Sequence, residues 1–105
     1  MKTTHIKELN IDVAILPEEV KFKDIKIPKG FRLAEDYEYL CVYKKHRNLL
    51  KLTNLWWCKS DKKDIARLCR LNDFDNDSDF GAIDGNVDVA DGWLRGVMIV
   101  KEKEE

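Results

Sequence analysis

The sequence predicts an α+β domain in which one or two helices pack on a twisted antiparallel sheet. A glycine-led extended piece, Gly30–Leu33, runs directly into a stretch with helical spacing that begins near Glu35. Several short runs rich in β-branched and aromatic residues are separated by turn signals, as is typical of strands. Apolar residues make up 44% of the 105 positions, which suffices for one modest core and predicts a single domain over residues 1–105.

The first third of the chain contains two expected strands. Residues 1–10 are polar and are expected to form a loosely held arm, and residues 101–105 a charged tail. The β-branched run Ile11–Leu16 stops at a proline, which cannot donate to a strand ladder. Val20–Ile27 alternates apolar and polar residues, and its change of parity predicts a strand with a bulge near Asp24.

The helix is expected to run from about Glu35 to Arg47–Asn48. Acidic residues fill its first turn and basic residues its last, and both complement the helix dipole. Tyr37, Leu40 and Cys41 recur at helical spacing and predict the buried face, so that Leu40 is expected in the core. His46 at the helix end is expected to act as a surface partner of the dipole rather than as a catalyst.

The middle of the chain holds the most apolar strand candidate, Leu55–Cys58. Its adjacent tryptophans, Trp56 and Trp57, should point to opposite faces of a strand, so that one fills the core and the other meets a second layer, a partner or water. Burial of both rings beneath loops is the alternative. Asp61–Leu71 fits a helix capped by Asp61 and also, less regularly, a strand.

The C-terminal third is expected to consist of turns and short strands. Asn72–Phe80 is a loop by composition. Gly81–Val89 predicts two short strands around a type I′ turn at Asp84–Gly85, and Trp93–Lys101 predicts the closing strand.

The stretch from Gly30 to Leu40, G-F-R-L-A-E-D-Y-E-Y-L, resembles the G-W-R-L-P-T-x-x-E-W-x-x-L signature of C-type lectin-like domains. That superfamily includes formylglycine-generating-enzyme-like domains and the variable proteins of diversity-generating retroelements. Its later pieces are a W-x-S strand, a strand opening on Ala, a Gly-bearing turn and a closing strand. The corresponding pieces here are Leu55–Ser60, Ala66–Leu71, Asp84–Asn86 and Leu94–Val100. The resemblance covers about residues 29–101, implies a C-type lectin-like fold, and favours a strand for Asp61–Leu71.

Composition excludes several classes of function. A net charge of −1 gives no reason to expect a nucleic-acid partner, and no apolar run approaches the length of a membrane span. The N-terminus lacks the apolar core of a signal peptide, so we expect a cytoplasmic or virion-associated protein. Cys41, Cys58 and Cys69 are odd in number and share no CxxC spacing, which predicts buried reduced thiols.

Charge is divided unevenly along the chain. Residues 64–100 contain no Lys and no Glu, although the chain has 14 Lys and 8 Glu elsewhere. This stretch holds eight of the twelve Asp and three Arg, a formal charge of −5, so the remainder carries +4. Such asymmetry bears on partners rather than on fold.

Catalysis is not predicted, and neither is a cofactor. No Ser/His/Asp or Cys/His arrangement can be recognised. The activity of formylglycine-generating enzymes depends on two closely spaced late cysteines, whereas Cys58 and Cys69 are eleven residues apart, so the resemblance implies the scaffold but not the chemistry.

The acidic loop raises the question of calcium. Asp73, Asp75, Asp77 and Asp79 alternate as in D-x-D-x-D calcium loops, but the Gly and Glu of an EF-hand loop are missing in either register. A solvated acidic loop is therefore preferred over a calcium site.

The prediction for function is non-catalytic binding of a protein ligand through the C-terminal face. Every residue from Leu68 to Gly92 belongs to the set that adenine-directed mutagenesis of Asn-type codons can produce, as the resemblance to retroelement variable proteins would require; chance composition of an acidic loop is the alternative. Aromatic side chains would anchor the partner and aspartates would steer it. The expected contact residues are Asn72, Asp73, Phe74, Asp75, Asp77, Asp79, Phe80, Asp84, Asn86, Asp88, Asp91 and Trp93. A small viral or phage-type inhibitor that binds a nucleic-acid enzyme through this acidic face is the alternative function.

Overall fold

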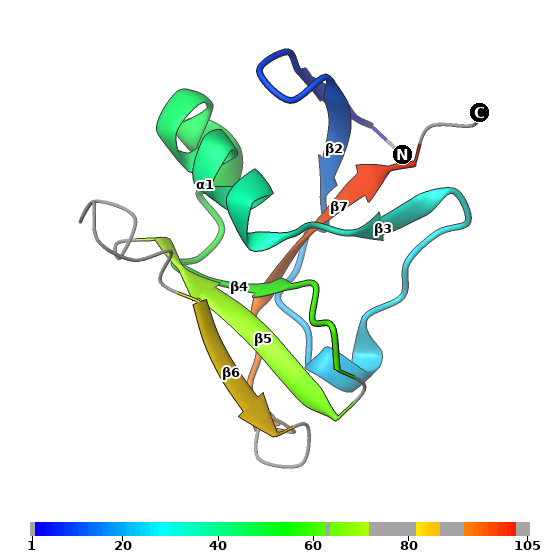
Figure 1. The fold of residues 1–105 in the computed structure, drawn as a ribbon, viewed down its shortest axis with the longest axis vertical. Coiled ribbons are helices and arrows are strands. Elements are labelled where there is room, and N and C mark those ends of the chain that lie inside the picture. The colour runs from blue at the N-terminus through cyan, green and yellow to red at the C-terminus, as the bar shows by residue number, and fades with distance from the viewer. Residues whose placement is uncertain (1, 63, 72–81, 87–91, 103–105) are drawn as a thin grey trace.

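The computed structural model describes residues 2–62, 64–71, 82–86 and 92–102 (Figure 1). In this part of the chain one α-helix packs with a mixed seven-stranded sheet, so the α+β class is confirmed. The elements are β1 (Thr4–Ile6), β2 (Ile11–Ile15), the 3-10 turn η1 (Phe22–Asp24), β3 (Phe31–Leu33), α1 (Asp36–Lys45), the 3-10 turn η2 (Arg47–Leu50), β4 (Leu55–Cys58), β5 (Ile65–Arg70), β6 (Ala82–Asn86) and β7 (Gly96–Lys101).

β7 is the central strand of the sheet, although it is the last in sequence (Figure 1). The strand order is β1-β2-β7-β4-β5-β6, and β3 also pairs with β7. Among the strand pairs of the described residues, β4 with β7 is parallel and the others are antiparallel, so the fully antiparallel sheet that we predicted is wrong in this pair. A parallel pair needs a long return connection, and the chain through β5 and β6 provides it.

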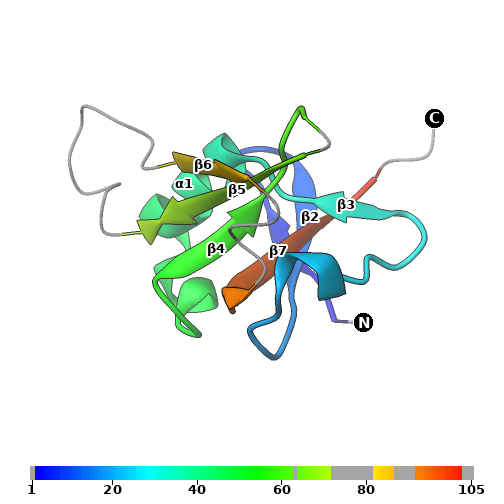
Figure 2. The same ribbon diagram turned by 90° about the horizontal axis from the view of Figure 1, so that it is seen from below.

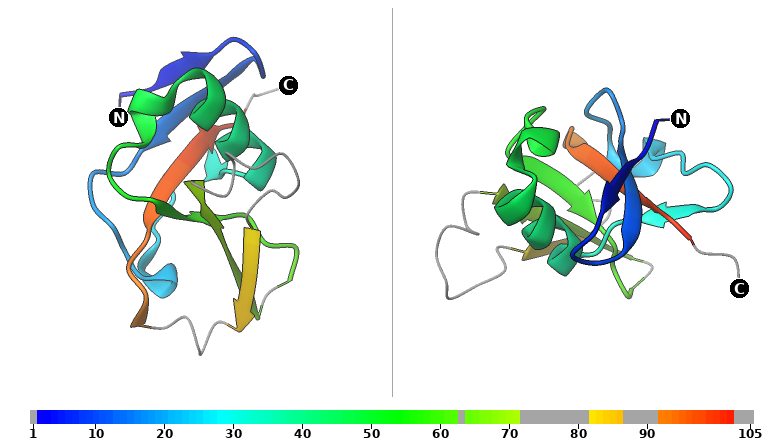
Figure 3. Two further views of the ribbon diagram at one scale, coloured as in Figure 1. Left: turned by 90° about the vertical axis from the view of Figure 1, so that its left-hand side faces the viewer. Right: turned by 90° about the horizontal axis from the view of Figure 1, so that it is seen from above.

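The sheet carries a core cluster on each face, and one tryptophan of β4 belongs to each. Trp56 lies in the cluster beneath α1, and Trp57 lies in the cluster beneath residues 16–31. Both rings are fully buried. Figures 2 and 3 show the helix on one side of the sheet and the η1 segment on the other. Trp57 is thus covered by a second layer. Because the connection between β2 and β3 is irregular apart from η1, the alternative of burial beneath a loop also describes this ring.

The N-terminal prediction needs two corrections. Residues 4–6 form β1, which pairs with β2, and Ile6 is fully buried, so this part of the expected loose arm is an ordered strand. The segment expected as a bulged strand contains η1 instead. Phe22 and Ile25, three residues apart, both pack into the cluster around Trp57, and a helical turn brings such residues to one side where a strand does not.

The helix lies close to its predicted range but buries a different face. Its buried residues are Glu38, Tyr39, Val42 and Tyr43, whereas Tyr37 is 46% exposed and Leu40 only half-buried. The buried residues therefore lie on roughly the opposite side of the helix from the predicted stripe, although Leu40 and Cys41 still pack partly on the core. Tyr39 and Tyr43 place two large aromatic rings on the buried face, whereas the predicted face carries only one, Tyr37.

The strand preferred for Asp61–Leu71 is confirmed as β5. The hairpin predicted around Asp84–Gly85 is wrong, because β6 continues through both residues as one strand. β5 offers it a partner along its whole length, from Ile65 opposite Asn86 to Cys69 opposite Ala82. The interstrand ladder thus overrides the local turn preference of an Asp-Gly pair.

Candidate functional site

The described part of the predicted binding face lies where the chain enters β7. Trp93 is half-buried and packs on the cluster around Trp57. Its ring lies over β6, 3.8 Å from the position that a Cβ on Gly85 would occupy. The adjacent Leu94 is 48% exposed, which is high for a large apolar side chain.

Arg95, which is also half-buried, completes a partly exposed Trp-Leu-Arg surface. Its backbone exchanges two hydrogen bonds with Val20, at 2.9 and 3.0 Å, which fixes the strand entry. The guanidinium carbon lies 5.6 Å from the centre of the Trp93 ring, within cation–π range. Nη1 donates to the Leu94 carbonyl at 2.6 Å, whereas no acceptor among the described residues meets the buried Nε.

Most residues predicted for this face lie outside the described part of the chain. Of the twelve, the structure describes Asp84 and Asn86 as β6 backbone and Trp93 in full. The face predicted around Phe74 and Phe80, and the four alternating aspartates of the calcium alternative, fall in the residues that are not described. Among the described residues, no three His, Cys, Asp or Glu side chains are grouped to hold a metal ion.

Two of the three thiols expected to be buried, those of Cys58 and Cys69, are buried, whereas Cys41 is only half-buried. The sulfurs of Cys58 and Cys69 lie 3.2 Å apart between β4 and β5, and both residues are fully buried. The hydrogen bond to Cys58, together with burial, raises the pKa of Cys69 far above that of a free thiol. A thiol that stays protonated is a poor nucleophile.

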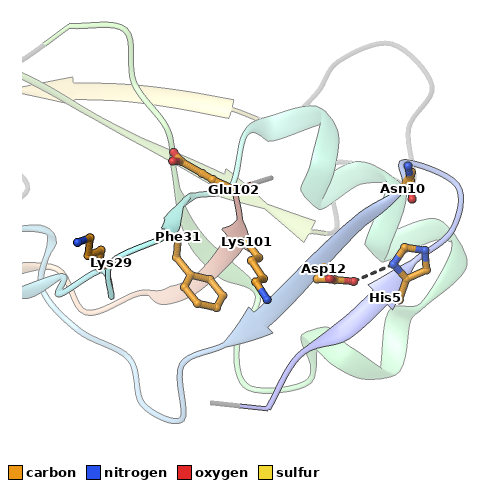
Figure 4. Close-up of a pocket in the computed structure, with 8 residues that line it drawn as sticks. His5, Asn10, Asp12, Lys29, Phe31, Lys101 and Glu102 are labelled. Atoms are coloured by element: carbon orange, nitrogen blue, oxygen red, sulfur yellow. Dashed lines mark hydrogen bonds and ion pairs between the residues drawn. The ribbon is translucent and has the colours of Figure 1, made fainter. Parts of the chain in front are cut away.

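A second surface was not predicted from the sequence. It is an open groove of about 1040 Å³ at the far end of the sheet, between the β1–β2 hairpin and β3 (Figure 4). Its lining residues are His5, Asn10, Asp12, Lys29, Gly30, Phe31, Lys101 and Glu102. They come from four strands and their turns, and no local spacing connects them, so the sequence carries no signal for this groove.

No helix in the described ranges is long and apolar enough to cross a membrane. No protein-family model, curated protein or solved structure matches this chain.

Proposed function

We propose that this protein is a non-catalytic binding protein that recognises a protein ligand through its C-terminal face, residues 72–93. The observation that carries the proposal is the Trp93–Arg95 surface. Tryptophan and arginine dominate the energetics of protein interfaces, and here they stack together next to an exposed leucine. Two backbone hydrogen bonds to Val20 hold Arg95 in place, and such pre-organisation lowers the entropy cost of binding.

The charge of the surrounding stretch indicates the chemistry of the partner. Residues 64–100 carry a formal charge of −5, with Arg95 as one of three cations. A basic protein surface is complementary to such a face, and long-range attraction of this kind speeds association. The partner would therefore be a protein that presents basic side chains around an apolar contact.

A C-type lectin-like scaffold is the finer fold that we propose. Four pieces in the order of that superfamily support it: β3 leading into α1, then β4, β5 and the closing strand β7. The Gly-bearing turn departs from that order, because β6 runs through Asp84–Asn86 as a strand. The two charged residues of the signature, Arg32 and Glu38, bond to each other. Every residue from Leu68 to Gly92 is one that adenine-directed mutagenesis of Asn-type codons can produce. On this scaffold, that uninterrupted run supports a retroelement-diversified variable protein.

The alternative, an inhibitor of a nucleic-acid enzyme, is favoured by one observation. The same −5 stretch could occupy a basic groove in competition with phosphate groups. The two functions differ in what displaces the partner: duplex DNA or RNA would compete for an inhibitor's target and would not compete for a diversified binder's ligand.

The test compares partner capture by three forms of the protein. Immobilised wild type and a Phe74→Ala/Phe80→Ala/Trp93→Ala variant are incubated with extract of the source cells, and retained proteins are quantified by mass spectrometry. Tyr37→Ala is the matched control, because Tyr37 is an exposed aromatic residue on α1. A partner retained by the wild type and by the control but lost from the triple variant supports the proposal. Equal retention by the triple variant shows that the binding face is elsewhere.

Folding of the triple variant must be checked by circular dichroism, because Trp93 packs partly on the core. A Phe74→Ala/Phe80→Ala variant that keeps Trp93 separates loss of contact from loss of fold. We expect it to weaken retention without changing the unfolding midpoint.

A further inference from the structure

The register of four strands places four different side chains in one row across the sheet. His5 lies opposite Asp12 in the β1–β2 pair, and Phe31 lies opposite Lys101 in the β3–β7 pair. The β2–β7 register sets Val13 opposite Val100, and one further step sets Asp12 beside Lys101. Residues directly opposite one another point to the same face of a sheet. Figure 4 shows Phe31, Lys101, Asp12 and His5 in this order along the groove.

This row lies at the edge of the layer that residues 16–31 form over the sheet. The next row inward on the same face consists of Ala14, Ile99 and Leu33, which pack in the cluster beneath residues 16–31. The outer row lies beyond that layer, and Phe31 bridges the two, because its half-buried ring packs against the cluster while lining the groove. The groove therefore has an apolar end that is anchored to the core.

The polar groups of the row are open to a ligand. Nδ1 of His5 bonds Oδ1 of Asp12 at 2.7 Å, which orients the carboxylate and leaves its second oxygen to accept. The ammonium of Lys101 has no carboxylate within ion-pair distance in the described part of the chain, although Asp12 is its neighbour across the ladder. The cation and the anion are thus adjacent but do not neutralise each other directly.

We propose that this groove binds an aromatic α-amino acid in its zwitterionic form. Neighbouring strands are about 4.8 Å apart. The Phe31 ring, the Lys101 ammonium and the Asp12 carboxylate therefore follow one another along the groove over about 10 Å. An aromatic amino acid presents the complementary series, with its ring on Phe31, its carboxylate on Lys101 and its ammonium on Asp12. His5 acts as a positioning residue that holds Asp12.

The carboxylate of Asp12 distinguishes this ligand from simpler ones. A plain anion would gain the Lys101 contact but would be repelled by Asp12, and Glu102 at the rim adds to that repulsion. An aliphatic amino acid would satisfy both charges but leave the Phe31 ring without its stacking partner. This inference does not depend on the C-terminal face, which uses other elements.

The experiment is a titration of the ¹⁵N-labelled protein with L-phenylalanine, followed by amide chemical shifts. Saturable shifts are expected at His5, Asp12, Phe31 and Lys101. Lys101→Gln and Asp12→Asn should each weaken binding about tenfold, which is the usual effect of losing one charge-assisted hydrogen bond. Lys51→Gln, which changes an exposed lysine after η2, is the matched control and should bind like the wild type.

Three ligand analogues test each contact separately. L-Phenylalaninamide lacks the carboxylate, N-acetyl-L-phenylalanine lacks the ammonium and L-alanine lacks the ring, and each should bind about tenfold more weakly than L-phenylalanine. Absence of shifts in the four residues would overturn the proposal. So would binding that is unchanged in both charge variants. If N-acetyl-L-phenylalanine bound as tightly as L-phenylalanine, the ligand's ammonium would not be recognised. That result would overturn the zwitterionic ligand and assign the groove to a C-terminal aromatic residue of a peptide.

Discussion

The guanidinium of Arg32 and the carboxylate of Glu38 form a bidentate ion pair that joins β3 to α1. Nη1 donates to Oε1 and Nη2 to Oε2, both at 2.7 Å, and the Glu35 amide donates to Oε1 at 2.8 Å. Glu38 is only 1% exposed, so its charge is desolvated and fully hydrogen-bonded. These hydrogen bonds raise the pKa of Arg32 above its already high usual value. The strand-to-helix corner is thus fixed by a charge pair as well as by packing.

Replacing Glu38 with Ala should lower the free energy of unfolding by about 3 kcal/mol, because removing one member of a buried pair leaves the other charge without compensation. The helix also loses the capping contact to the Glu35 amide. Urea unfolding measures the change. Glu18→Ala, at an exposed carboxylate, is the control and should stay within about 0.5 kcal/mol of the wild type. A loss no larger than that of the control would show that the pair does not hold the corner.

Replacing Tyr39 with Phe should lower stability by about 3 kcal/mol, although only one oxygen is removed. The Tyr39 hydroxyl donates to the Trp57 carbonyl at 2.5 Å and accepts from the Met98 amide at 2.9 Å, so it bridges α1 to β4 and β7. Without it two buried backbone groups lose their partner. Tyr37→Phe on the exposed face is the matched control and should have no effect on the thermal midpoint. Equal midpoints for the two variants would contradict the bridging role.

Replacing Gly96 with Ala should destabilise the protein by about 3 kcal/mol through overpacking. A Cβ at Gly96 would lie 2.6 Å from the Trp56 ring, and that ring is fully buried and tied to the Thr53 carbonyl by its Nε1 at 2.9 Å. The ring therefore cannot move aside without disturbing the core. Gly92→Ala meets nothing within 4 Å and should be nearly neutral in the same urea titration.

Stability should fall as the solution becomes alkaline. Burial raises the pKa of the Tyr39 hydroxyl well above its usual value near 10.0, and the hydrogen bond to Cys58 with burial raises the pKa of the Cys69 thiol above 9.0. Above those values the unfolded chain has lost protons that the folded chain keeps, so the unfolded state binds fewer protons and the free energy of unfolding declines as pH rises.

The decline should begin near pH 9 and steepen near pH 10, at about 1.4 kcal/mol per pH unit for each group. Below pH 9 both contributions are fully present. A Cys69→Ala variant should reduce the first part of the decline and keep the second, as measured by urea unfolding at a series of pH values. The Cys41 thiol, whose pKa is also raised by burial, accounts for the part that remains. A profile that is the same in the variant and the wild type would show that Cys69 does not contribute.

The row of four side chains along the groove is a feature that could not be predicted from the sequence. Phe31 and Lys101 are 70 positions apart, and His5 and Asp12 come from another hairpin. Each of the four is an ordinary strand residue in its own local sequence. Only the registers of three strand pairs bring them together, and long-range register cannot be obtained from one chain's periodicity.

The sequence by itself determined the class of fold, the corner from Gly30 to the helix, and the strand at Leu55–Cys58, because these depend on local signals such as charge at helix ends and runs of β-branched or aromatic residues. The strand at Ile65–Arg70 is favoured by the resemblance, since the local pattern there fits a helix more regularly than a strand. The tertiary structure alone decided that β6 continues through Asp84–Gly85 and that Val20–Ile27 contains a helical turn. In both cases a partner distant in sequence, β5 or the Trp57 cluster, supplies more free energy than the local preference opposes.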